Sequence, residues 1–167
     1  MHMHFGQPTL HFAMYQHMLK RTTTSTFFIL RSVYLSGEKL SCIKMVKVEI
    51  VNPNIGILEQ TMKEIVASIG GELVNYVVDY YGNREEVLMG IINETFHRGI
   101  GVRVSSSGQL QIVGDFWGIP RSEVEKFRQM LVQRYTANAL AYALGTMGYS
   151  VAKQEAEEQI LIRAVQY

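Results

Sequence analysis

Residues 45–71, MVKVEIVNPNIGILEQTMKEIVASIGG, carry the clearest structural pattern of the chain. Residues 46–50 alternate apolar and charged side chains, which is typical of a strand with one buried face. Asn54 is a good helix N-cap, and apolar residues then recur at steps of three and four from Ile55 to Ile69, which predicts a helix with one apolar face. Gly70 favours an end there, because glycine adopts the left-handed cap conformation. This stretch therefore predicts a strand followed by an amphipathic helix.

The residues that follow extend this pattern. Residues 73–81, rich in Val and Tyr, and the apolar residues 87–92 predict two strands around a Gly82-Asn83 turn. Residues 100–104 and 110–113 predict a hairpin around a serine-rich loop. A helix is expected over residues 120–147, opened by a capping box of Ser122 and Glu125 and ended by Gly148. Residues 149–153 and 160–165 predict a final hairpin.

The order β-α-β-β-β-β-α-β-β predicts an α+β fold, an antiparallel sheet with two helices on one face, related to ferredoxin-like folds. Short connections favour antiparallel pairing of the middle strands. A helix, a glycine and a strand follow one another twice, which hints at two β-α-β-like halves. Residues 45–167 are long enough to form a single domain with its own core.

The parts of the chain before residue 45 and from residue 45 onward carry net charges of opposite sign. Residues 1–44 contain five Lys/Arg and one acidic residue (net +4), whereas residues 45–167 contain eleven and fourteen (net −3). The leader, residues 1–44, also holds the only cysteine, Cys42, and four of the five histidines. Three interpretations remain open: upstream sequence read as protein before a true start at Met45, an organelle transit peptide, or a genuine binding arm. The first is the preferred interpretation.

Residues 45–167 lack the common catalytic and metal-binding patterns. They hold one histidine, His97, and no cysteine, so no zinc spacing occurs and no metal or cofactor is expected. No Gly-x-Ser-x-Gly motif accompanies the serines at 105–107. Asp115 stands between a predicted strand and a predicted helix, beside Trp117. It either closes the loop by accepting backbone hydrogen bonds, which we favour, or serves a small enzyme as acid or base.

Nucleic-acid binding is a second alternative. The predicted long helix carries Arg121, Lys126, Arg128 and Arg134, and tyrosines 76, 80 and 81 could stack on bases from the sheet. The acidic balance of residues 45–167 argues against RNA or nucleotide binding without excluding it. The chain has no run of about 18 apolar residues, so no membrane span is expected.

Three short segments resemble a known family. They are Gly114-Asp115-Phe116-Trp117-Gly118, Gln133-Arg134-Tyr135-Thr136 and Gly148-Tyr149-Ser150-Val151. They are similar to the Asp-Trp-Trp, Gln-Arg-Tyr-Ala and Gly-Phe motifs of the hypothetical chloroplast reading frame thirty-five family. Those are small uncharacterised proteins of plastids, cyanobacteria, archaea and phages. Phe116, Thr136 and Tyr149 depart from the pattern, the leader has no counterpart, and the match is best over residues 110–165.

The resemblance implies no established activity. Because family members are encoded beside an AAA-type ATPase, it implies an adaptor or subunit role. The sequence therefore favours a cytoplasmic, non-enzymatic binding or adaptor module, with organelle import a minor alternative. Its strands could also pair between two copies to give a homodimer. The expected contact patch comprises Asp115, Phe116, Trp117, Arg128, Arg134 and Tyr135.

Overall fold

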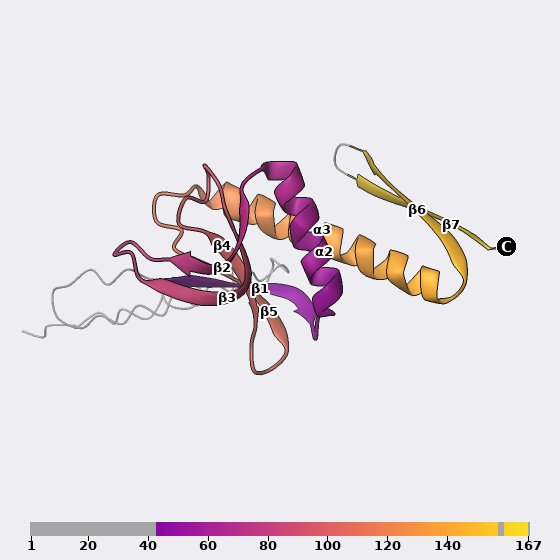
Figure 1. Cartoon of the computed structure of the whole chain (residues 1–167), viewed down its shortest axis with the longest axis horizontal. Coiled ribbons are helices and arrows are strands. Elements are labelled where there is room, and N and C mark those ends of the chain that lie inside the picture. Colours follow the sequence, from indigo (N-terminus) through magenta and orange to yellow (C-terminus); the bar gives the residue numbers. More distant parts are fainter. Residues whose placement is uncertain (1–42, 157–158, 167) are drawn as a thin grey trace, which may run out of the picture.

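The computed structural model describes residues 43–156 and 159–166 (Figure 1). Nearly all of the leader, residues 1–42, lies outside the described residues, and so do the interpretations given for it. Strand β1 begins at Lys44, one residue before Met45, and Lys44 pairs with Gly114.

The predicted order of helices and strands is confirmed. The elements are β1 (Lys44–Val51), α2 (Ile55–Ile69), β2 (Glu72–Val78), β3 (Arg84–Ile92), β4 (Ile100–Val104), β5 (Gln109–Gly114), α3 (Arg121–Thr146), β6 (Tyr149–Ala156) and β7 (Gln159–Gln166).

The main sheet has five antiparallel strands in the order β1-β5-β4-β3-β2. Strands β2 to β5 form a meander, and β1 adds to its far edge. The edge strands β1 and β2 are therefore parallel, and α2 connects them across the face of the sheet. This is a widened form of the split β-α-β unit of ferredoxin-like folds, with three strands between the parallel pair.

The hint of two β-α-β-like halves is wrong. Strands β6 and β7 pair only with each other among the described strands, and they form a separate two-stranded sheet. The second helix–glycine–strand segment therefore leads away from the main sheet rather than back to it.

Helices α2 and α3 cover one face of the main sheet, as predicted (Figure 1). The alternation at Val46, Val48 and Ile50 points these side chains at the helices, where they are buried. Leu58 of α2 and Leu131 of α3 are fully buried in the same cluster. At about 25 cal/mol per Å² of apolar surface removed from water, this shared core is the main source of stability.

The opposite face of the sheet holds a smaller cluster of Val77, Val87 and Val113, against which Ile43 packs. Gly101 lies beneath it, and a Cβ there would lie 2.8 Å from a methyl carbon of Val87. Glycine at this position lets the Val87 side chain lie directly on β4.

Three of the four predicted helix ends are confirmed, among them the stop at Gly148, which follows α3 with a φ of 87°, and one is wrong. The Asn54 side chain accepts a hydrogen bond from the Ile57 amide at 3.1 Å, and Gly70 has the expected positive φ of 73°. The capping box at Ser122 does not form, because Pro120 is the N-cap of α3 and the helix begins two residues earlier than this box requires, without a side-chain cap. Glu125 hydrogen-bonds to Arg128 instead.

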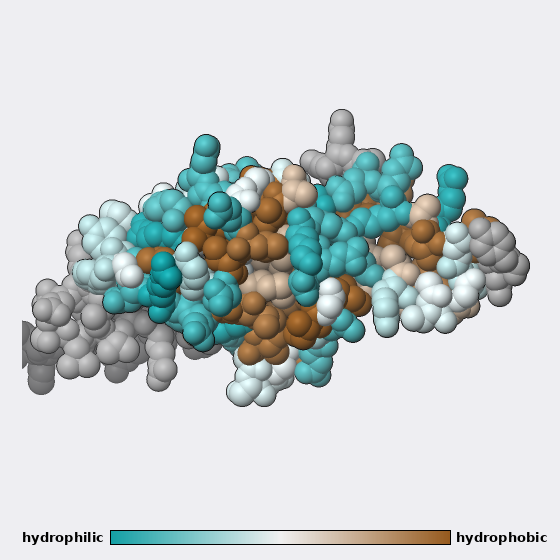
Figure 2. All heavy atoms as spheres, viewed as in Figure 1, coloured by the Kyte–Doolittle hydropathy of each residue, from teal (hydrophilic) through white to brown (hydrophobic). Residues whose placement is uncertain are grey.

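The last part of the chain packs differently. We call residues 139–156 and 159–166, which comprise the end of α3, the Met147-Gly148 link, β6 and β7, the C-terminal arm, and the rest of the described chain the body. The arm lies along and beyond the end of the helix pair (Figure 1). None of the arm side chains that the structure describes is fully buried. Apolar residues of body and arm reach the surface between polar ones (Figure 2), and Leu140, Met147, Leu161 and Val165 are exposed in the arm.

Candidate binding surface

A buried ion pair fixes the loop that follows β5. Arg98, from the β3–β4 connection, donates from Nη1 to Asp115 Oδ2 at 2.8 Å, and the two side chains are 14% and 3% exposed. Arg98 Nη2 also donates to the Trp117 carbonyl at 2.9 Å, and the Trp117 amide donates to Asp115 Oδ1 at 3.1 Å. The backbone at Trp117 is thereby bonded on both its amide and its carbonyl side.

Three aromatic side chains gather on this fixed loop. Trp117, Tyr80 and Tyr81 are 66%, 61% and 56% exposed. The Tyr80 ring centre lies 5.5 Å from those of both Trp117 and Tyr81, with edge-to-face geometry. The Arg98 guanidinium carbon lies 5.7 Å from the Tyr80 ring centre and 5.9 Å from that of Trp117. We call Tyr80, Tyr81 and Trp117 the aromatic patch.

The tyrosines reach this patch because β2 is shorter than predicted. It ends at Val78, so Tyr80 and Tyr81 lie in the β2–β3 turn, whereas Tyr76 remains on the strand. Asp79 closes the turn by accepting hydrogen bonds from the Tyr81 amide and from both the amide and the side chain of Asn83. The side-chain hydrogen bond from Asn83 is the main cause that lowers the pKa of Asp79. The three tyrosines therefore do not form the single surface on the sheet that the sequence predicts. Tyr80 and Tyr81 lie at the end of the sheet instead.

Phe116 faces the other way from Trp117. It is buried in the core with the helices. A Cβ on Gly114 would lie 2.6 Å from a ring carbon of Phe116, so glycine makes room for that ring. Of the predicted loop residues, Asp115 and Phe116 are buried and hold the loop in place, whereas Trp117 is exposed.

Arg128, a residue of α3, lies away from the loop that follows β5 and joins α3 to β1. Its guanidinium donates two hydrogen bonds to Glu125 Oε1 and another, at 2.8 Å, to Glu49. The hydrogen bond between Arg128 and Glu125 is the main cause that raises the pKa of Arg128 and lowers that of Glu125. Lys126 likewise pairs with Glu123 at 2.8 Å. These cations of the helix face are neutralised by carboxylates, which leaves little free charge for phosphate.

Arg134 and Tyr135 are neighbours in α3 with different partners. Arg134 donates from both terminal nitrogens to Glu155 of β6, at 2.7 and 3.0 Å. The Tyr135 hydroxyl accepts a hydrogen bond from the Asn54 amide at 2.8 Å, where α2 begins. The six residues of the predicted contact patch therefore occupy separate places in the fold, and only Asp115, Phe116 and Trp117 lie together.

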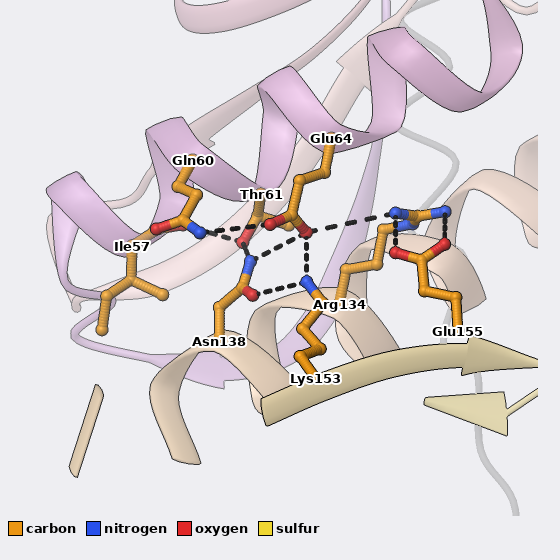
Figure 3. Close-up of polar contacts among 8 residues, drawn as sticks. All are labelled: Ile57, Gln60, Thr61, Glu64, Arg134, Asn138, Lys153 and Glu155. Atoms are coloured by element: carbon orange, nitrogen blue, oxygen red, sulfur yellow. Dashed lines mark hydrogen bonds and ion pairs between the residues drawn. The ribbon is translucent and has the colours of Figure 1, made fainter. Parts of the chain in front are cut away.

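A polar cluster between α2, α3 and β6 surrounds Arg134 (Figure 3). Lys153 Nζ donates to Glu64 Oε2 at 2.6 Å and to Asn138 Oδ1 at 2.8 Å. Asn138 Nδ2 donates to the same Glu64 oxygen and to Thr61 Oγ1, each at 3.1 Å. Burial raises the pKa of Glu64, but hydrogen bonds from Lys153 and other donors outweigh it and leave the pKa below its ordinary value. We call Glu64, Arg134, Asn138, Lys153 and Glu155 the polar clasp.

Of the five clasp residues, only Arg134 belongs to the contact patch predicted from the sequence. One local signal was present: Asn138 interrupts the apolar stripe of the long helix, where a polar residue needs a hydrogen-bonding partner if it is buried. Nothing in the local sequence pairs it with Glu64, which is 74 residues away.

The chemistry open to these surfaces is limited. The carboxylate of Asp115 is covered and bonded to Arg98 and Trp117, so we propose no acid or base role for it. The hydroxyl groups of Ser105 and Ser107 share a hydrogen bond. The Ser105 hydroxyl also accepts a hydrogen bond from the Gln109 amide, which closes the β4–β5 loop. Within the described residues, no group of three or more His, Cys, Asp or Glu could hold a metal ion. No helix of the described part is long and apolar enough to cross a membrane.

Comparison with known proteins places these features in a family. No curated protein and no solved structure matches the chain. A family model described as Protein of unknown function (DUF1257) matches residues 71–165, which include Trp117, both tyrosines of the aromatic patch, and the clasp residues other than Glu64. This confirms the expectation of a small uncharacterised domain family. Since the match covers more than half of the chain, the chain belongs to the family Protein of unknown function (DUF1257).

Proposed function

We propose that this chain is a non-enzymatic protein-binding module that docks its partner on the aromatic patch. The observation that carries the proposal is the exposure of Trp117, Tyr80 and Tyr81 on one supported loop pair. Tryptophan and tyrosine dominate the energetics of protein interfaces, because each buries a large area with few rotatable bonds.

The support beneath the patch favours tight binding. Both backbone groups of Trp117 are held by the Arg98–Asp115 pair, and Asp79 closes the turn that presents the tyrosines. Little loop entropy is then lost when a partner binds, so more of the contact energy contributes to affinity.

The partner we propose is an AAA-type ATPase, with the chain as its adaptor or subunit in the cytoplasm. This identity rests on the resemblance to the hypothetical chloroplast reading frame thirty-five family. A homodimer formed by pairing of strand edges is compatible with the same role, and light scattering on the full chain would measure it.

A protein partner is favoured over RNA. The aromatic patch could stack on bases, but Arg128, Lys126 and Arg134 are all paired with carboxylates. The phosphate backbone supplies most of the affinity of nucleic-acid binding through free cations. RNA or nucleotide binding therefore remains the alternative that the experiment must separate.

The experiment compares Trp117→Ala with Tyr142→Ala, which removes an equally exposed aromatic residue from the arm. Binding of each full-length variant to an AAA-type ATPase from the same source is measured by calorimetry. We expect Trp117→Ala to weaken binding at least ~30-fold, as for an interface hot spot of about 2 kcal/mol, and Tyr142→Ala to leave it unchanged.

Two results would change the proposal. Equal affinities of wild type and Trp117→Ala would remove the aromatic patch as the docking site. Binding of a single-stranded RNA oligonucleotide that weakens steeply with salt and is lost in Trp117→Ala would replace the protein partner with RNA.

A further inference from the structure

The hairpin β6–β7 packs on α3, and among the described strands β6 and β7 pair only with each other. It supplies no side chain to the main buried cluster of the body. A two-stranded hairpin by itself is at best marginally stable in water, so its position depends on how it is held against the helices.

Apolar contact holds the hairpin only in part. Val151, Ile160 and Ile162 alternate with exposed residues along the two strands and are half-buried. Leu161, between Ile160 and Ile162, and Val165, further along β7, are exposed. The apolar area removed from water per residue is therefore smaller here than in the body, and so is its contribution to stability.

The polar clasp supplies the specific attachment (Figure 3). Lys153 and Glu155, both on β6, reach Glu64 of α2 and Arg134 of α3, and Arg134 also lies 4.0 Å from Glu64. The side chains of Glu64 and Lys153 are 24% and 21% exposed. Charges placed at this depth regain water when they separate, and salt screens their attraction.

We propose that β6–β7 is a strap that opens from the helices as a unit while the body stays folded, and that the polar clasp holds it closed. Two carboxylates, Glu64 and Glu155, face two cations, Arg134 and Lys153, so the closed cluster is balanced in charge. Opening breaks the contacts across the clasp and uncovers the half-buried apolar side of the hairpin. Local opening of this kind needs less free energy than global unfolding.

Hydrogen exchange of backbone amides in the full chain tests the strap. The variant is Lys153→Met, which keeps the apolar stem and removes the charge that joins Glu64 and Asn138. Its control is Lys63→Met, which removes the matching charge of an exposed ion pair with Glu59 on the same helix as Glu64. We expect exchange in β6 and β7 to rise ~10-fold or more in Lys153→Met, with exchange in β4 and β5 unchanged and with Lys63→Met like wild type.

A salt series and a second variant complete the test. Raising NaCl should speed exchange of the hairpin in wild type towards the rate in Lys153→Met, because the clasp is screened. Glu155→Gln, which weakens the bidentate contact of Arg134, should act in the same direction with a smaller effect, since Glu155 is about half exposed. If exchange rises equally in hairpin and sheet, or if neither variant nor salt changes it in the hairpin, the strap is overturned.

Discussion

The body and the C-terminal arm of this chain are stabilised in different ways. In the body, alternating strand residues and two helix faces meet in one cluster of buried apolar side chains. In the arm, the described side chains are at most half-buried, and a clasp of four charged residues and one amide joins the hairpin to the helices. One helix, α3, therefore serves two kinds of packing along its length, with Asn138 as its last buried residue.

The largest effect is expected at the most buried ion pair of the described body, Arg98–Asp115. Asp115→Ala would leave the Arg98 guanidinium buried without its partner, and Nε of Arg98 already has no hydrogen-bond partner among the described residues. Removing one member of a buried pair costs about 3–5 kcal/mol of unfolding free energy. Urea unfolding measures it.

The control for this change is Glu123→Ala, which removes the partner of Lys126 from an exposed pair. Its cost should stay below about 1 kcal/mol. Similar losses of unfolding free energy in the two variants would show that the Arg98–Asp115 pair stabilises the body no more than an exposed ion pair does.

A matched pair of truncations compares the two regions directly. Leu131→Ala removes a side chain that is fully buried in the body and should cost about 3 kcal/mol. Ile162→Ala truncates a half-buried residue of the arm and should cost about 1 kcal/mol or less. Both are measured as free energies of unfolding in urea. Equal costs would mean that the arm belongs to the same packed unit as the body.

The fold of the body could be predicted because its signals are local. Alternation over residues 46–50 and the cap at Asn54 lie within a few residues of the elements they specify, and both predictions are confirmed. The capping box at Ser122 was wrong because a start two residues earlier places the serine inside the helix. The tyrosines of the patch were placed on a strand because Val and Tyr favour strands, although Asp79 closes a turn there.

The candidate site was harder to predict because its contacts join distant residues. Arg98 and Asp115 are 17 residues apart, and Glu64 and Lys153 are 89 apart. Arg128 and Arg134 were grouped because they share a helix. Six residues of an α-helix correspond to a rotation of about 240°, so the two guanidiniums point to different neighbours, β1 and β6.

Lowering the pH should loosen the arm before it affects the body. Because the pKa of Glu64 in the folded chain lies below its ordinary value of 4.5, its charge stabilises the closed clasp above that pH. This contribution is lost as the pH falls from about 4.5 through the lowered value. We expect amide chemical shifts of β6 and β7 to change in this range before those of β4 and β5. Glu64→Gln should remove the early change. A single transition shared by hairpin and sheet would contradict the separate opening of the arm.

The smallest effect concerns the residue next to the clasp. Arg134 bonds to the arm, whereas Tyr135 accepts a hydrogen bond from the Asn54 amide and so joins α3 to the start of α2 within the body. Tyr135→Phe removes this acceptor at a partly exposed position, where water can replace it, so the cost should be about 0.5–1 kcal/mol in urea unfolding. Tyr142→Phe, at an exposed position of the same helix, should cost nothing measurable. Because this hydrogen bond lies within the body, hydrogen exchange of β6 and β7 relative to the sheet should stay as in wild type. Faster exchange confined to the hairpin would show that body and arm are coupled through α3.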